Sequence, residues 1–248
     1  TGDGGLTKAG AGTLILSGTN TYTGGTTVSA GTLSISADAN LGAAAGVLTM
    51  GNQSRLRAQT SLTLNRSVVL GGSAILAVDD AGATLTVAGV ISGNETLNLL
   101  GSESGGGTVI LAAENTYVGE TAVVGVTLQI SSDKNLGDAR GTLQMTSATL
   151  ATTADISSDR WVELYTDSTF TPDANTSLTL NGVVAEAGGL IKRGAGTLVL
   201  NGANTYAGGT TLYEGTLTVG ANDALGTGTV TFAGNATLDF AAAATDVS

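Results

Sequence analysis

The chain has 248 residues, a net charge of −11, and no cysteine or histidine. The missing cysteines exclude disulfides, thiol catalysis and thiolate-bound metals, and the missing histidines remove the commonest general base and transition-metal ligand. The acidic balance argues against binding to nucleic acid or to anionic membranes, and no apolar run approaches the roughly 18 residues that a membrane-spanning helix needs.

The composition favours β-structure with many turns. Glycine supplies 38 residues, about twice its usual share of roughly 7%. Proline occurs once, at Pro172, so the glycines do not belong to a disordered linker. The apolar residues are mostly leucine, valine, isoleucine and alanine, with many threonines beside them. This mixture suits strands that line a thin interior.

Short predicted strands follow one another along the chain. In 32–36, Leu33 and Ile35 alternate with three hydroxyl residues, which is the period-2 pattern of a half-buried strand. Helical spacing is not sustained anywhere, apart from an ambiguous alanine-rich tail at 241–244. The predicted strands, in chain order, are 14–16, 32–36, 62–64, 76–78, 85–87, 127–131, 178–180 and 216–220.

A block of 31 residues occurs three times without insertions, at 12–42, 107–137 and 196–226, and 12 positions are identical in all copies. Recurrence at a spacing near 90 residues is typical of a solenoid, whose units bury their apolar faces by stacking. We therefore predict an all-β, right-handed parallel β-helix of about 11 coils, with roughly 22 residues per coil. A set of antiparallel sandwiches would share the turn signals but would not explain an ungapped recurrence.

Each block contains the sequence Asn-Thr-Tyr-x-Gly between two predicted strands. The asparagines and tyrosines could form a row of ligands or a sugar-binding surface. Three copies in identical context favour another interpretation, in which the asparagine amide bonds the local backbone and the tyrosine packs in the turn or covers a coil edge. The predicted structural turn positions are Asn20, Tyr22, Gly24, Asn115, Tyr117, Gly119, Asn204, Tyr206 and Gly208.

Leucines recur at matching places on the predicted strands of each block. Their period-2 spacing, with threonine and serine on the alternate positions, predicts that they point inward. On the same pattern, Ser34 should lie at the surface. The predicted core positions are Leu16, Leu33, Leu111, Leu128, Leu200 and Leu217.

Acidic residues are the remaining candidates for chemistry. Asp79 and Asp80 are the only adjacent acidic pair, and a second, spaced group surrounds Arg160 and Trp161: Asp155, Asp159, Glu163 and Asp167. Neighbours on a strand point to opposite faces, and a glycan lyase also needs basic residues, of which this chain has nine in total. The calcium-binding nonapeptide of parallel β-rolls is absent, so the acidic stretch 67–133 is interpreted as a solvated face. No catalytic residue, metal or cofactor is predicted.

The blocks resemble the autotransporter-associated β-strand repeat, also called the passenger-associated transport repeat. GTLxLxGxNTYxGGTTV, followed by GTLxIS and Leu-Gly, carries the resemblance in the first and third copies. The central copy departs from it at Glu120 and at Gly125-Val126. The resemblance implies a bacterial type V autotransporter with a Sec signal, a long β-helical passenger and a C-terminal translocator barrel. It also implies a location at the outer face of the outer membrane, or secretion.

The functional expectation is a non-catalytic β-helical stem that supports adhesion, self-association or display of a distal domain. Its expected partners are a second copy, or a protein or glycan of a host surface, with no nucleic acid and no membrane insertion of this segment. Two alternatives are a β-helix polysaccharide lyase or hydrolase and a crystal- or ice-binding module. Residues 1–248 are expected to form one continuous β-helix. Because Gly5–Lys8 matches Gly189–Lys192, this β-helix is expected to be a fragment of a longer passenger.

Overall fold

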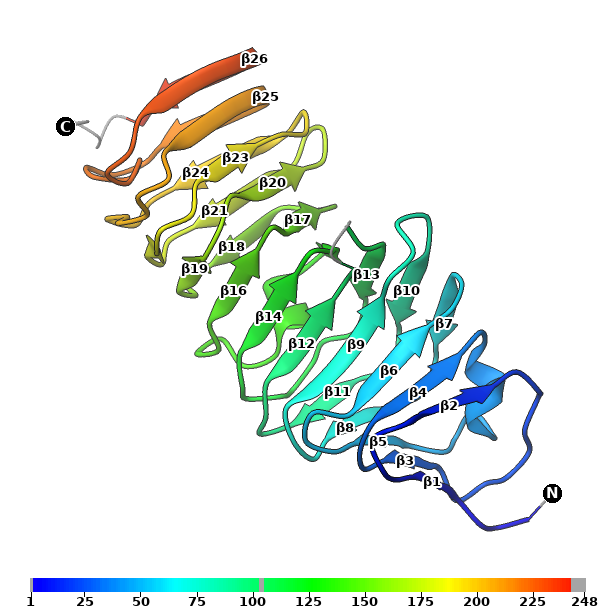
Figure 1. Cartoon of the computed structure of the whole chain (residues 1–248). Coiled ribbons are helices and arrows are strands. Elements are labelled where there is room, and N and C mark those ends of the chain that lie inside the picture. Colours follow the sequence, from blue (N-terminus) through cyan, green and yellow to red (C-terminus); the bar gives the residue numbers. More distant parts are fainter. Residues whose placement is uncertain (1, 103–104, 242–248) are drawn as a thin grey trace. The chain divides into compact units, whose positions relative to one another are not determined.

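The computed structural model describes residues 2–102 and 105–241, and its regular elements are almost all parallel β-strands joined by turns and loops (Figure 1). The chain divides into two compact units: residues 1–126 with 134–138, and residues 127–133 with 139–248. Each unit is a parallel β-solenoid, and the coils of the two together number about 11, as predicted. Whether the coils form one uninterrupted β-helix stays a prediction.

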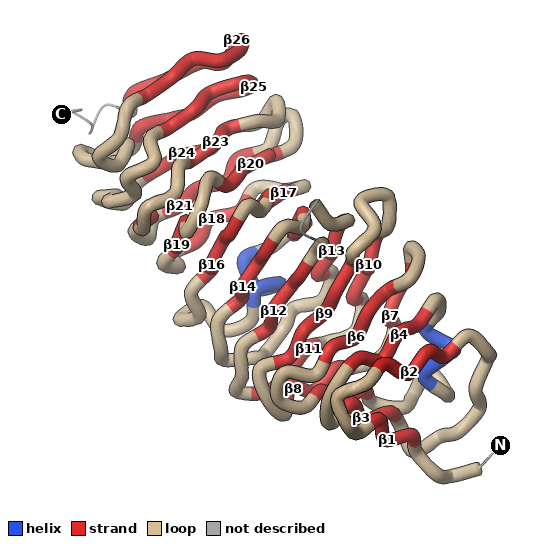
Figure 2. Tube along the Cα trace, viewed as in Figure 1, coloured by secondary structure: helices blue, strands red, loops and turns tan. Residues whose placement is uncertain are grey.

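Helix is almost absent from the described part of the chain (Figure 2). It holds two single 3-10 turns, η1 (Asp38–Leu41) and η2 (Asp133–Leu136). Neither is long enough to cross a membrane. The alanine-rich tail at 241–244 lies outside the described residues beyond Ala241.

Three parallel sheets form the first unit, one on each side of the coil. The described coils take 19 to 24 residues, as in the pairings of Thr13 with Thr32 and of Thr84 with Thr108. The first sheet contains β1 (Leu6–Lys8), β3 (Thr26–Val28), β5 (Leu48–Met50), β8 (Val68–Leu70) and β11 (Ile91–Gly93). The second contains β2 (Thr13–Leu16), β4 (Thr32–Ile35), β6 (Arg55–Ala58), β9 (Ala74–Val78), β12 (Leu97–Leu100) and β14 (Thr121–Val124). The third contains β7 (Leu62–Leu64), β10 (Thr84–Val87) and β13 (Thr108–Leu111).

In the second unit, two sheets merge because β25 (Thr210–Val219) runs around a corner. Its first half pairs with β23 (Leu190–Lys192) and its second half with β24 (Thr197–Leu200), and β26 (Val230–Phe240) pairs with it in parallel. The merged sheet also holds β15 (Thr127–Ile130), β17 (Thr149–Thr152), β20 (Ser168–Pro172), β23 (Leu190–Lys192), β24 (Thr197–Leu200), β21 (Ser177–Leu180) and β18 (Ile156–Ser158). The other side of the coil is formed by β16 (Leu143–Thr146), β19 (Val162–Leu164) and β22 (Val184–Ala185).

Parallel stacking in register produces ladders of like side chains inside each coil. Leu33 pairs with Leu56, which continues into Leu76 and then Leu99, and all four side chains are fully buried. Such buried aliphatic columns supply the main favourable term in folding. Among the predicted core leucines, Leu33, Leu111, Leu128, Leu200 and Leu217 are fully buried. Leu16 is half-buried, because β2 is the edge strand of its sheet and has a neighbour on one side only.

The prediction that Ser34 lies at the surface is wrong. Ser34 is 1% exposed although it alternates with the inward-pointing Leu33 and Ile35. Its neighbours in the sheet are Ile15 and Arg57, whose longer side chains flank it on the outer face. Its hydroxyl oxygen is buried without a hydrogen-bond partner.

Truncating Leu33 and Ser34 separately should have opposite consequences. Leu33→Ala opens a cavity in the leucine ladder and should lower the free energy of unfolding by about 2–5 kcal/mol. Ser34→Ala removes an unpartnered buried hydroxyl and should leave stability unchanged within about 0.5 kcal/mol or raise it. Denaturant unfolding of both variants measures this, and similar losses at the two positions would show that the facing of β4 is misassigned.

Candidate functional site

The repeated asparagines tie neighbouring coils together. The Asn115 side chain accepts a hydrogen bond from the Ile91 amide (2.8 Å) and donates one to the Asn135 carbonyl (2.5 Å). Asn204 does the same between the Val184 amide (2.7 Å) and the Ala224 carbonyl (2.6 Å). These partners lie 20 to 24 residues away, so the expectation of bonds to the local backbone is wrong for Asn115 and Asn204. Asn20 does make such a bond, to the Gly18 carbonyl at 3.4 Å. The coil length brings the same corner of the previous and the next coil beside each amide.

In the first copy, the asparagine forms the same kind of hydrogen bond to a neighbouring coil, but its side chain is more exposed. Asn20 is half-buried and donates to the Asn40 carbonyl at 2.7 Å, one coil further on. Asn40, which lies in η1, makes the reverse contact: its side chain donates to the Gly18 carbonyl of the preceding coil at 2.9 Å. Asn135 repeats this second contact with Ala113 at 2.8 Å. The sequence analysis missed this second asparagine, whose recurrence in two of the three copies was the available signal.

The repeated tyrosines form no aromatic surface. Tyr117 and Tyr206 are fully buried, and Tyr22 is half-buried. Each hydroxyl lies 2.6–2.7 Å from the hydroxyl of the threonine four residues later: Tyr22 with Thr26, Tyr117 with Thr121, and Tyr206 with Thr210. Burial raises the pKa of Tyr206 to about 12, and the hydrogen bond to Thr210 acts against that shift. The tyrosines therefore pack in the corner and are not available to stack on a sugar.

Glycines occupy the places where coils approach most closely. Gly24, Gly119 and Gly208 each lie against the backbone of the preceding coil, where an added Cβ would collide with backbone atoms. The glycine that closes each block has a left-handed backbone, with φ of 81° at Gly42 and 67° at Gly226. A Cβ there would also meet the tyrosine of the preceding coil. Only glycine fits both requirements.

Successive copies of the block are displaced by one sheet. Each copy contains three strands. The middle strand of the first copy, β3, belongs to the first sheet, whereas the middle strand of the second copy, β14, belongs to the second sheet together with β4, the last strand of the first copy. In the other unit, β15 of the second copy shares a sheet with the first half of β25, which belongs to the third copy. The middle and last strands of one copy lie on consecutive sides of the coil, so matching positions of neighbouring copies occupy different sides. The asparagines therefore form no row of ligands on one face.

Two buried arginines, which the sequence analysis did not single out as corner residues, seal the loops that close the first and second blocks. The guanidinium of Arg66 is completely buried and donates to the Asp38 carboxylate at 2.8 Å. It also donates to five backbone carbonyls of the same loop: Asp38, Leu41, Gly42, Ala43 and Gly46. Arg160 binds the Asp133 carboxylate through Nε (2.9 Å) and Nη2 (3.2 Å), and the carbonyls of Asp133 and Gly141.

Two inward-pointing lysines close turns in the same manner. Lys192 occupies an interior ladder position between Phe170 and Leu212 and is fully buried. Its ammonium donates to the carbonyls of Arg193, Gly194 and Glu214 at 2.7–3.0 Å. Loss of hydration lowers the pKa of Lys192 to about 8, and the charge of Glu214 opposes this shift. The matching residue Lys8 is 7% exposed and binds the carbonyls of Ala9, Gly10 and Ala30.

The acidic pair does not form a reactive dyad. Asp79 is bound by Arg55 and Arg57, each at 2.7 Å. Asp80 accepts a hydrogen bond from the Gly82 amide at 3.0 Å and so stabilises its own turn. The two carboxylates thus have separate structural partners.

The spaced acidic group is also divided among different contacts. Asp155, Asp159 and Asp167 each accept a hydrogen bond from the coil 22 residues further on, at Ser177, Asn181 and Gly189 respectively. Glu163 accepts one from the hydroxyl of Tyr165 at 2.9 Å. Within residues 2–102 and 105–241, no three acidic side chains gather in a way that could hold a metal ion.

Exposed aromatic side chains flank β19. Trp161 is 54% exposed and Tyr165 is 48% exposed, while Val162 and Leu164 between them are buried. Glu163 lies on the same outer side, bonded to Tyr165. We call these three residues, Trp161, Glu163 and Tyr165, the aromatic strip. A large apolar area beside a carboxylate suits contact with a protein or sugar surface.

The coil corners and the repeated block define a class of protein. The passenger-associated-transport-repeat family matches residues 6–35, 104–130 and 190–219, and each match contains one Asn-Thr-Tyr corner. The chain therefore carries three passenger-associated transport repeats and, over these residues, is similar to the β-helical passengers of autotransporters.

A curated relative agrees with this assignment. The adhesin BmaC autotransporter of Brucella suis biovar 1 (strain 1330) is 37% identical to the chain over 160 residues. The match covers 60% of this chain and 5% of the relative, so the chain spans a small part of that protein's length. No solved structure matches the chain.

Removing a corner asparagine should destabilise the protein in proportion to its inter-coil bonds. Asn115→Ala leaves the Ile91 amide and the Asn135 carbonyl buried without this partner, and should lower the free energy of unfolding by about 2–4 kcal/mol. Asn20→Ala, at the half-exposed corner, should cost about 1 kcal/mol. Denaturant unfolding measures both. Equal losses would contradict the inter-coil role of the buried amide.

The combined contribution of Lys192 and Tyr206 to stability should be largest near pH 10. The unfolded chain holds the Lys192 proton up to about pH 10.5 and the folded chain only to about pH 8, so stability rises with pH between these values. Tyr206 loses its proton near pH 10 when unfolded and near pH 12 when folded, so stability falls across that range.

Two variants assign these slopes in chemical unfolding at a series of pH values. Lys192→Met should flatten the rise between pH 8 and pH 10.5, and Tyr206→Phe should flatten the fall above pH 10. A Lys192→Met protein with the pH dependence of the parent would rule out Lys192 as the cause of the rise.

Proposed function

We propose that this segment is a non-catalytic stem of a surface autotransporter that supports adhesion or self-association. One observation carries the proposal: the repeated polar side chains are used in hydrogen bonds between coils. Asn115 and Asn204 bridge backbones, and Arg66 and Arg160 fill the loops that close two blocks. A residue that links neighbouring coils in every repeat stabilises a long stack of coils, and a stem requires such a stack.

The relative and the aromatic strip support adhesion in particular. The relative is named an adhesin, and its similarity covers more than half of this chain. Trp161 and Tyr165 offer exposed aromatic area that could contact a host protein, a glycan or another copy. Weak contacts of this kind add up when many coils align. The full-length protein would also contain a C-terminal translocator that anchors the passenger.

An enzymatic role is less well supported. A glycan hydrolase needs two carboxylates placed on either side of one bond, or a base beside the substrate. Asp79 is paired with two arginines, and Asp159 is bonded to Asn181 of the next coil. Both carboxylates serve contacts within the fold.

Surface display tests the adhesive role. Cells that display a passenger containing residues 1–248 should aggregate or adhere to host cells more strongly than cells displaying the same passenger without this segment. Trp161→Ser with Tyr165→Ser should reduce adhesion several-fold while unfolding at the same denaturant concentration as the parent. Thr169→Ala with Thr171→Ala, on the outer face of β20, is a matched control in a different sheet. Adhesion that is unchanged by deleting the segment would contradict the proposal.

A polysaccharide panel tests the absence of catalysis. The purified chain should release no new reducing or unsaturated ends from any substrate. Reproducible product release that is abolished by Asp79→Asn, Asp80→Asn or substitution within the Asp155–Asp167 group would overturn the stem assignment in favour of an enzyme.

A further inference from the structure

Three consecutive outward positions at β19 hold an aromatic residue, an acid and a second aromatic residue. These are Trp161, Glu163 and Tyr165, the aromatic strip, and they alternate with Val162 and Leu164, which are buried inside the coil. At about 3.3 Å per residue of strand, the step from Trp161 to Tyr165 separates their Cα atoms by roughly 13 Å. This separation exceeds the length of one sugar ring, so a sugar ligand would reach both aromatic rings only as a chain of several units.

Short side chains on the neighbouring coils leave the two aromatic rings accessible. β19 pairs with β16, which lies beside it in Figure 1, and with β22. Continuing these registers by one residue places Thr142 and Val183 on either side of Trp161, and Thr146 beside Tyr165. None of these three side chains is long enough to cover an indole or phenol ring. The rings therefore stand above a flat side of the coil with their faces open to solvent.

The polar group of the strip lies in its middle. Glu163 is flanked by Gln144 and Ala185, and its Oε2 accepts a hydrogen bond from the Tyr165 hydroxyl at 2.9 Å. In the part of the chain that the structure describes, Oε1 has no donor, so it can accept a hydroxyl of a ligand. A protein-binding hot spot has the opposite layout, with apolar groups at a desolvated centre and polar groups at the rim. Sugars combine C–H faces that stack on aromatic rings with hydroxyls that donate to a carboxylate, so this layout favours a sugar chain over a protein.

The charges around the strip favour a neutral sugar. Within 142–146, 161–165 and 183–187, the charged residues are Glu163 and Glu186, and both are acidic. A uronic or sialic acid bound to the strip would bring its carboxylate close to that of Glu163, and like charges at short range repel each other. A neutral sugar avoids this repulsion and still donates its hydroxyls.

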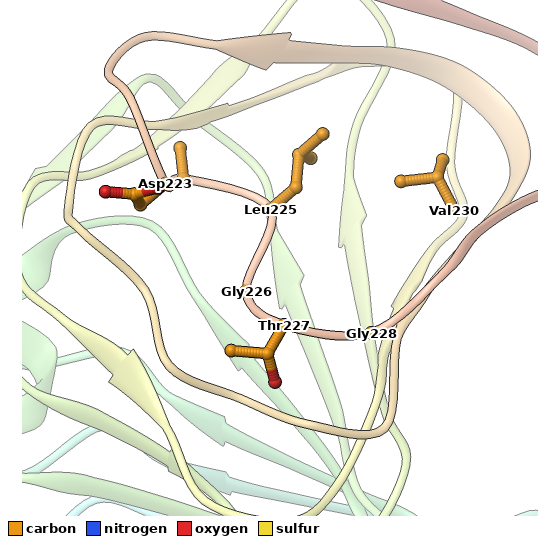
Figure 3. Close-up of a pocket in the computed structure, with 7 residues that line it drawn as sticks. Asp223, Leu225, Gly226, Thr227, Gly228 and Val230 are labelled. Atoms are coloured by element: carbon orange, nitrogen blue, oxygen red, sulfur yellow. The ribbon is translucent and has the colours of Figure 1, made fainter. Parts of the chain in front are cut away.

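Two recesses elsewhere in the second unit lack an aromatic platform. A cavity of about 120 Å³ in the loop from Asp223 to Val230 is lined by aliphatic and small residues and by Asp223 (Figure 3). Another recess, at the corner that contains Asp155 and Asn175, is lined by polar and small residues. Neither offers a ring on which a sugar would stack, whereas the strip offers two rings and an acceptor between them.

We propose that the aromatic strip binds a neutral, extended oligosaccharide of the cellulose or chitin type. One sugar ring would stack on Trp161 and another on Tyr165, and a hydroxyl between them would donate to Glu163. Chains of this type expose flat C–H faces along their length, which suits a straight row of separated aromatic rings on a flat surface. This glycan specificity rests on the adhesive role proposed above and gives that role a class of ligand.

Tryptophan fluorescence of the whole chain tests the strip directly, because Trp161 is the one tryptophan in the sequence. Cellohexaose or chitohexaose should move the emission to shorter wavelength and saturate at millimolar concentration, since stacking removes water from the indole. Cellobiose should bind about tenfold more weakly, because it is too short to engage both rings at once. No change in emission with either hexasaccharide, or equal affinities for cellobiose and cellohexaose, would overturn the proposal.

Variants of the second aromatic ring and of the acid test the geometry while keeping the fluorescent reporter. Tyr165→Ser should weaken hexasaccharide binding to the level of cellobiose, and Tyr165→Phe, which keeps the ring, should stay within a few-fold of the parent. Tyr213→Ser is the matched control, because Tyr213 stacks on Arg193 at 3.7 Å in a different sheet, and it should leave binding unchanged. Equal losses in Tyr165→Ser and Tyr213→Ser, at an unfolding midpoint equal to that of the parent, would refute the two-ring site.

Hexagalacturonate tests the preference for a neutral sugar. It should bind the parent chain several-fold more weakly than cellohexaose, and Glu163→Gln should narrow this difference because it removes the repelling charge. Hexagalacturonate binding as tight as that of cellohexaose to the parent would refute the charge selection.

Competition in the display assay separates the glycan site from the adhesive role. If both hold, soluble chitohexaose or cellohexaose should reduce the adhesion of cells that display the passenger. Adhesion that is lost in the Trp161→Ser and Tyr165→Ser variant but insensitive to both hexasaccharides would assign the strip to a protein partner, refuting the glycan site and keeping the adhesive role. Hexasaccharide binding by the purified chain, with adhesion that does not depend on residues 1–248, would keep the glycan site and refute the adhesive role.

Discussion

Backbone amides and carbonyls at the corners of a parallel coil must find hydrogen-bond partners where no strand continues. Along the strands the neighbouring coils satisfy these groups, but at the corners the backbone ladder is incomplete, and a buried group left without a partner there costs about 1–3 kcal/mol. This chain meets the requirement with side chains. Asn115 serves one amide and one carbonyl, Lys192 serves three carbonyls, and Arg66 serves five.

The same requirement explains how a chain with few charges uses them. Of nine basic residues, Lys8, Arg66, Arg160 and Lys192 are buried inside corners. Their positive charges are stabilised by backbone carbonyl groups and, for Arg66 and Arg160, by the carboxylates of Asp38 and Asp133. The outer surface is left with most of the acids and few bases, which makes it a poor surface for polyanions.

The solenoid could be predicted from the sequence because its two determinants are local or repeated. Leu33 and Leu128 stand at period-2 positions, and the block recurs without gaps, so strands and stacking follow directly. Burial of Ser34 could not be predicted, because it depends on Ile15 and Arg57 in neighbouring coils. The two-sided role of Asn115 could not be predicted either, since its partners are identified only once the length of each coil is known. Arg66 and Arg160 lie outside the repeated blocks and carried no recurrent signal.

The displacement of each block by one sheet has a consequence for how such proteins change in length. If a gene gains or loses one complete repeat, every residue beyond that point leaves the coil from a neighbouring side. A distal domain would then face a new direction without any substitution in the domain or in its attachment. Three such events would restore the original direction and alter only the reach. Variation in the number of repeats would therefore change the direction that a distal domain faces separately from its distance along the coil.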